Sequence, residues 1–165
     1  MKVNIGRYPK KINAERKISV KIEPFDIWSM DHTLALIIYP MLVMLKKNKH
    51  GYPHTDPKDT PHMGVGTAEN EYEFEPDAEA RWSWILDEMI WAFSQVIDDD
   101  AEAQFHSGVH DMQAKEIEVD GKKMYEMIKG PNDTHVFDSE GWGAWHARKT
   151  NGFKLFGKYY ENLWD

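Results

Sequence analysis

The sequence predicts an α+β domain in which three long helices pack together and carry two small β-hairpins. Three segments place apolar side chains three or four residues apart, which is the spacing of one buried helix face. Two pairs of shorter segments alternate apolar and polar side chains on either side of turn-forming residues, which is typical of hairpins. The 165 residues are enough to enclose one hydrophobic core, so we expect a single domain over residues 1–165.

The N-terminal part predicts a hairpin followed by a helix. Residues 2–8 and 17–23 alternate in the manner of two short strands joined by a polar turn. Asp26 is then a suitable N-cap for a long helix that runs to about Lys47. Pro40 lies inside this helix and removes one backbone donor, so we expect a kink or a break there.

The middle of the chain predicts a long loop and a second helix. Gly, Pro, Asp, Thr and His dominate residues 50–76, and this composition is that of a loop. The second helix should start near Asp77 and run to about Ile97, because its apolar residues recur as one stripe.

The C-terminal part predicts the second hairpin and the last helix. Residues 116–119 and 123–128 flank Asp120-Gly121, a pair suited to the positive φ angles of a tight turn. A final helix should begin at about Ser139, because large aromatic residues then recur at helical spacing.

Composition and charge argue against several classes of function. The 20 basic and 28 acidic side chains give a formal charge of -8, which repels phosphate backbones, so duplex nucleic acid is not expected as a partner. Cysteine is absent, which removes disulfides and thiolate metal sites and fits a reducing cytoplasm. The N-terminus lacks a signal peptide, and the longest apolar run, residues 34–45, is too short to cross a bilayer. We therefore expect a cytoplasmic protein without a membrane partner.

Two adjacent carboxylates, Asp87 and Glu88, interrupt the aromatic second helix and are the first candidates for chemistry. Among apolar neighbours a carboxylate has to pair, bind a cation or keep its proton. Asp31 would meet them if the first two helices pack antiparallel, and such an oxygen-rich cluster would suit Mg²⁺ or Mn²⁺. This hypothesis describes a metal-dependent nucleotide phosphohydrolase with these three carboxylates as catalytic candidates. The alternative is a structural network in which Arg81, Arg148, a nearby lysine or an indole satisfies Asp87.

Two histidines, His106 and His110, are four residues apart. On a helix both imidazoles would lie on one face and could contact a zinc ion. Gly108 lies between them, however, and no third ligand has a matching spacing. The alternative is that both are exposed histidines of a loop.

The C-terminal stretch combines glycines, lysines and aromatic residues. Lys154, Lys158 and Tyr159 could bind a nucleotide by charge and stacking. Trp84 and Trp91 of the second helix are further candidates for ligand contacts. The alternative is that the stretch simply docks a terminal helix. The sequence has no phosphate loop, dinucleotide fingerprint, Ser-His-Asp elbow or zinc-protease motif.

Three blocks of the sequence resemble a family of proteins that tailed bacteriophages encode. The blocks are WSMDHTLALII followed by PML, then RWSWILDEMIWAF, and finally NGFKLFGKYY, and they cover the predicted helices. The family carries no assigned activity. The resemblance therefore implies a phage origin and expression in a bacterial host, and it transfers no catalytic residue.

A small acidic phage protein without a catalytic motif is expected to be a binding protein rather than an enzyme. We expect it to engage a host protein, or to sequester a small ligand such as a nucleotide, in the bacterial cytoplasm and without a cofactor. Its abundant Trp, Tyr, Met and Phe favour a binding surface. The alternatives are the metal-dependent hydrolase and a minor virion component. A helix face rich in Trp and Met also favours a homodimer.

Overall fold

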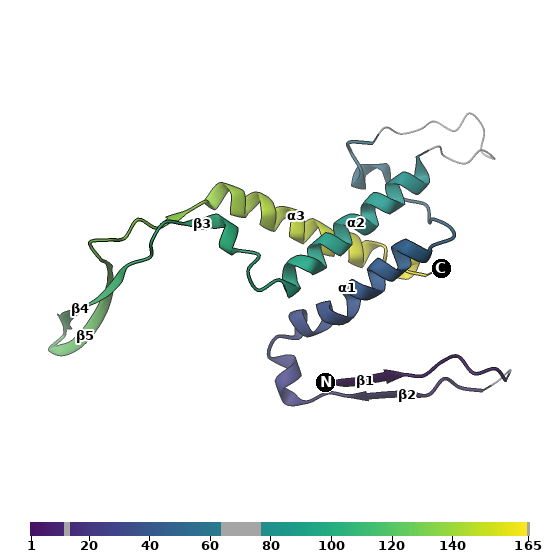
Figure 1. Cartoon of the computed structure of the whole chain (residues 1–165), viewed down its shortest axis with the longest axis horizontal. Coiled ribbons are helices and arrows are strands. Elements are labelled where there is room, and N and C mark those ends of the chain that lie inside the picture. The colour runs from purple at the N-terminus through teal and green to yellow at the C-terminus, as the bar shows by residue number, and fades with distance from the viewer. Residues whose placement is uncertain (12–13, 64–76, 165) are drawn as a thin grey trace.

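The computed structural model describes residues 1–11, 14–63 and 77–164. These residues form three α-helices and three antiparallel two-stranded ribbons, which confirms the predicted α+β class (Figure 1). The helices are α1 (Met30–Asn48), α2 (Ala78–Ile97) and α3 (Ser139–Lys158). The strands are β1 (Lys2–Ile5), β2 (Ile18–Lys21), β3 (His106–Ser107), β4 (Met112–Val119), β5 (Lys122–Lys129) and β6 (Val136–Phe137).

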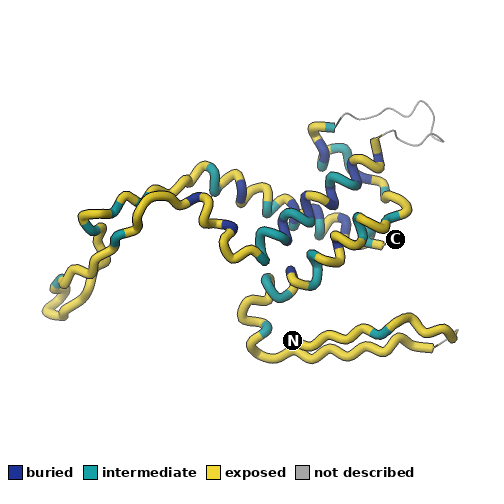
Figure 2. Tube along the Cα trace, in the orientation of Figure 1, coloured by how far each residue is buried: buried dark blue, intermediate teal, exposed yellow. Residues whose placement is uncertain are grey.

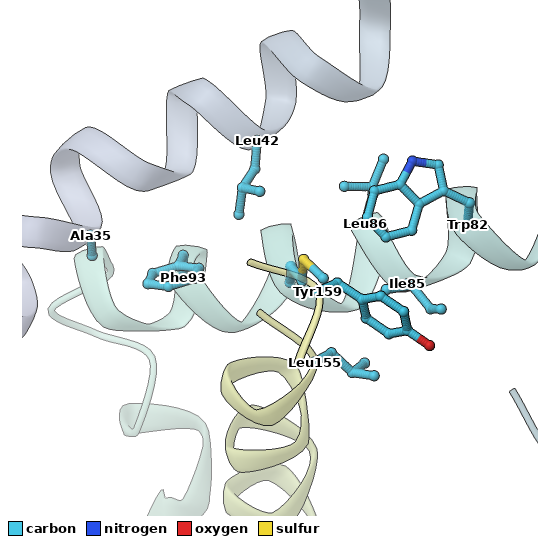
Figure 3. Packing of buried hydrophobic residues seen from close by; sticks show 9 residues of the cluster. Ala35, Leu42, Trp82, Ile85, Leu86, Phe93, Leu155 and Tyr159 are labelled. Atoms are coloured by element: carbon cyan, nitrogen blue, oxygen red, sulfur yellow. The ribbon is translucent and has the colours of Figure 1, made fainter. Parts of the chain in front are cut away.

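The core lies on the two sides of α2, against which α1 and α3 pack (Figure 3). The stripe of α2 that the sequence predicts is buried, and each neighbouring helix adds fewer side chains. The core residues are Ala35 and Leu42 from α1, Trp82, Ile85, Leu86, Met89 and Phe93 from α2, Leu155 from α3, and Tyr159, which directly follows α3. A second, smaller cluster of Ala101, Phe105 and Trp145 continues the core along α3.

Helices α2 and α3 approach each other closely at a glycine. A Cβ atom added to Gly152 would lie 2.4 Å from the Cβ of Ala92 and 2.6 Å from the carbonyl oxygen of Glu88. Only a residue without a side chain fits this contact. The glycine that weakens the helix by propensity therefore permits the packing on which the helix depends.

Helix α1 (Met30–Asn48) continues through Pro40, so the break, one of the two outcomes expected at the proline, is not observed. Helix α3 starts at Ser139 as predicted, and Asp138 caps it by accepting a hydrogen bond from the backbone N–H of Gly141 at 2.9 Å. None of the helices in the described ranges combines the length and apolar character needed to cross a bilayer.

The two predicted hairpins are present and differ from the prediction only in strand length. Asp120 and Gly121 have φ angles of 50° and 74°, which gives the tight turn that this pair predicts between β4 and β5. Strands β1 and β2 pair in register from Lys2 with Lys21 to Ile5 with Ile18. Both hairpins are exposed along nearly their whole length and project from the helical body (Figure 2).

The long loop is described in part. Residues 50–63 contain a short 3₁₀ helix, Pro57–Asp59, and they bury Thr55 and Thr60 against the helices. The other residues of the predicted loop, 64–76, lie outside the described residues. The third ribbon, in which β3 pairs with β6, was not predicted, because each of its strands has only two residues.

Substituting Gly152 by alanine should destabilise the protein by about 1–3 kcal/mol, because the added methyl group overpacks the contact between α2 and α3. Gly143→Ala is the matched control, since a Cβ atom there would have nothing within 4 Å. The control should gain up to about 1 kcal/mol from helix propensity. Urea unfolding of both variants measures the difference, and equal stabilities would contradict the close contact.

Candidate functional site

The three predicted carboxylates do not come together. Asp87 is exposed and forms an ion pair with Lys46 of α1. Lys49, which directly follows α1, pairs with Glu79 near the start of α2, so the two helices run antiparallel as expected. Asp31 then lies about 22 Å from Lys46 along α1, since a helix rises 1.5 Å per residue.

The three carboxylates proposed to share Mg²⁺ or Mn²⁺ are therefore not close together in this structure. Asp87 and Asp31 are a helix length apart, and Glu88 points toward α3 rather than α1. Within residues 1–11, 14–63 and 77–164, no three His, Asp or Glu side chains converge closely enough to hold a metal ion. The antiparallel packing was anticipated, but the start of α1 lies opposite the far end of α2.

Glu88 is the buried carboxylate of the pair. Its side chain is 8% exposed and accepts two hydrogen bonds from Arg148 of α3, from Nε at 2.9 Å and from Nη2 at 2.7 Å. The guanidinium carbon lies 3.9 Å from the ring centre of Trp91. Hydrogen bonding to Glu88 raises the pKa of Arg148 above its ordinary value. This is the structural network that the sequence offered as an alternative, with Glu88 in the place expected for Asp87.

Trp84 and Arg81 also contact the loop, whereas Lys154 is exposed. The ring of Trp84 lies 4.7 Å from that of His62 in the loop. Arg81 is fully buried and donates from Nε to the hydroxyl of Thr55 at 3.4 Å. Lys154 is exposed on α3, one turn before Lys158.

Lys158 and Tyr159 connect the end of α3 to the loop. The Lys158 ammonium donates to Asp59 at 2.7 Å and to Asp56 at 3.2 Å. The Tyr159 hydroxyl donates to Asp59 at 2.6 Å and accepts from the backbone N–H of Asp56 at 3.0 Å. Asp59 and Asp56 raise the pKa of Lys158 to about 12, and burial raises that of Tyr159. The geometry matches the docking alternative, in which these residues hold the loop and the terminal helix together.

His106 and His110 belong to a row of stacked rings rather than to a helix. His106 lies on β3, and its Nδ1 is 2.9 Å from Nε2 of His135. The ring of His110 lies 4.7 Å from that of His135, and the ring of Phe137 lies 5.0 Å from that of His106. The zinc site was predicted from the spacing of His106 and His110 on one face of a helix. His106 lies on strand β3 instead, so the two imidazoles do not share a helical face. His135 was missed because it is 29 residues from His106 in sequence.

An apolar groove lies between α1 and the C-terminal end of the described chain, with a volume of about 810 Å³. We call it the α1 groove, and its lining residues are Leu34, Ile38, Met41, Leu42, Leu45, Phe156, Tyr160, Leu163 and Trp164. All nine of these residues are uncharged. A nucleotide phosphate would therefore find no cation in the groove, whereas an apolar side chain would leave water on entering it.

The signal for this groove is present in the sequence. Residues 34–45 form a run of apolar residues without a charge, so the helix is apolar on all sides. A helix of this kind is usually buried all round. In the structure α2 covers one side only, where Ala35 and Leu42 are buried. The rest of α1 therefore leaves apolar surface open.

Comparison of the chain with protein-family models, curated proteins and solved structures finds no match. The resemblance to tailed-phage proteins therefore stays a prediction, and the site has to be interpreted from its own geometry.

Replacing Arg148 by methionine should cost about 2 kcal/mol, because it leaves the Glu88 carboxylate buried without its partner. Loss of one partner from a fully buried pair costs about 3–5 kcal/mol, and the value is lower here because half of the Arg148 side chain is exposed. The matched control is Lys46→Met, which leaves the exposed carboxylate of Asp87 and should cost less than about 1 kcal/mol. Equal losses in urea unfolding would contradict the distinct roles of Glu88 and Asp87.

Alkaline pH should weaken the attachment of the loop. The pKa of Lys158 is about 12 in the folded protein and 10.5 ordinarily, so its contribution to stability is complete below pH 10.5 and is lost as the pH rises through 12. Tyr159 acts in the same direction, since its pKa is also raised. The free energy of unfolding should therefore fall from pH 10.5 to 12, and less steeply in Lys158→Met. Lys154→Met should keep the slope of the wild type, and parallel slopes in all three proteins would disprove the assignment.

Proposed function

We propose that this chain is a phage-encoded binding protein that acts in the host cytoplasm by engaging a host protein, and that it catalyses no reaction. The α1 groove is the proposed contact surface, and the segment it receives is an amphipathic helix. The observation that supports this proposal is the open apolar surface of a helix that should be covered on all sides.

The groove residues have the chemistry of a protein-binding surface. Met41 is 66% exposed and Trp164 is 73% exposed, although both are large apolar side chains. Tyr160 lies beside them at the rim of the same groove. Aromatic residues and methionine are enriched in interface cores, and contiguous apolar patches on soluble proteins usually mark contact sites.

The shape of the groove supports a helical segment as the occupant. Its α1 wall runs from Leu34 to Leu45 and has a length of about 17 Å, which corresponds to roughly three helical turns. Peptide helices bind such grooves through apolar side chains at positions i, i+3, i+4 and i+7. A nucleotide fits the lining less well, because the candidate lysines Lys154 and Lys158 do not line the groove.

The hydrolase alternative has less support. It depended on Asp31, Asp87 and Glu88 sharing one divalent ion, and two of these carboxylates are held by Lys46 and Arg148 instead.

A photo-reactive amino acid placed at position 160, which lines the same groove as Met41, tests the proposal in a lysate of a bacterial host. We expect irradiation to cross-link one host protein through a segment that mass spectrometry identifies as an amphipathic helix. Capture of the same protein should be lost in Met41→Glu, because a charge in the groove has to be desolvated.

Tyr125→Glu is the matched control, since Tyr125 is an equally exposed residue on the β4–β5 hairpin. It should capture the host protein as the wild type does. Unchanged circular dichroism would show that Met41→Glu is folded. Cross-linking only to a second copy of the chain, or equal capture by Met41→Glu, would refute the proposal.

A further inference from the structure

The N-terminal hairpin has one apolar face that nothing in the described part of the chain covers. Val3 pairs with Val20 and Ile5 pairs with Ile18, so these four side chains share one face. Lys2, Lys21, Asn4 and Ser19 lie on the other. All residues of both strands are exposed, and Ile18 is 64% exposed. An isolated two-stranded hairpin is at best marginally stable in water, so this face needs a partner.

The base of the hairpin is fixed to the helical body. The Asp26 carboxylate accepts hydrogen bonds from the Met1 amine and from the backbone N–H of Glu23, both at 2.7 Å. The Asp26 carbonyl oxygen accepts a hydrogen bond from the Thr33 hydroxyl of α1 at 3.3 Å. The hairpin is therefore held at its root while its strands extend away from the three helices (Figure 1).

The apolar surface continues from the hairpin onto α1. Phe25 and Trp28, in the short connection between them, are 84% and 86% exposed. On α1 an outer stripe of Leu36, Pro40 and Val43 is also exposed. The residues of this outer stripe lie roughly 100–160° around the helix from Met41, so the stripe is distinct from the α1 groove.

The N-terminal hairpin and the rest of the chain carry opposite net charges. Residues 1–22 carry seven basic side chains and one acidic side chain, a formal charge of +6. The other residues carry 13 basic and 27 acidic side chains, a formal charge of -14. A basic arm is therefore attached to an acidic body, and opposite charges favour the docking of one onto the other.

We propose that the chain forms a two-fold symmetric dimer in which the hairpin of each copy docks with its apolar face on the outer stripe of α1 of the other copy. The dimer covers in one step the apolar face of the hairpin and the outer stripe of α1, and it leaves the α1 groove open. It brings the basic arm of one copy onto the acidic body of its partner. A two-fold axis uses both surfaces twice, which helps to reach the roughly 800 Å² per partner of a stable interface.

Analytical ultracentrifugation of the full chain tests the dimer. We expect the wild type to be a dimer at micromolar concentration, and Ile18→Glu and Leu36→Glu each to raise the dissociation constant at least about 30-fold. Ser19→Glu is the control for the arm, because it adds the same charge on the opposite face of β2. Met41→Glu is the control for α1 and should remain a dimer, which keeps this test separate from that of the α1 groove.

Cross-linking then identifies the contact between copies, since the natural chain has no cysteine. Val20→Cys and Leu36→Cys, carried on chains of different mass and mixed, should be joined by a short bismaleimide. Adding Ile18→Glu to the first chain should abolish the product. A monomeric wild type, or dimers that persist in both Ile18→Glu and Leu36→Glu, would overturn the proposal. So would cross-linking within one chain that carries both cysteines, or a basic arm that is occupied by co-purified nucleic acid.

Discussion

Helix α2 has to satisfy two neighbouring helices at once, and the rest of the structure depends on how it does so. Its apolar side chains face α1 on one side and the end of α3 on the other. The one carboxylate that this arrangement buries, Glu88, is neutralised by Arg148, which itself lies against Trp91. A buried charge without a partner would be far more costly than the pair is favourable, so the network fixes the position of α3. Gly152 then sets how closely the two helices approach.

The helical body leaves much of the chain outside its core. Both long hairpins are exposed, and α1 buries only Ala35 and Leu42 although it is apolar on all sides. A chain that works alone would gain stability by covering these surfaces, because buried apolar area is the main source of folding free energy. Their exposure is understandable if other molecules cover them, and the groove and the outer stripe lie on different sides of α1. One surface can then serve self-association while the other remains open to a host protein.

Polar side chains that the sequence offered as ligand or metal contacts link distant segments of the fold to one another. Lys158 and Tyr159 hold the loop through Asp56 and Asp59. The two histidines of the predicted zinc site stack with His135 in the ribbon that leads to the β4–β5 hairpin. In each case the partners come from distant parts of the chain.

The helices, the two long hairpins and the Asp120-Gly121 turn could be predicted from the sequence, because periodicity, capping and turn chemistry act within a few residues. The sequence could not decide between Asp87 and Glu88, which differ by one position on α2 and by about 100° around it. That choice was made by Arg148, which is 60 residues away, and by Lys46, which is 41 residues away. Tertiary structure likewise decided which side of α1 is open. The apolar sequence predicts that this helix is covered, but only the packing of α2 and α3 determines which of its sides stays exposed.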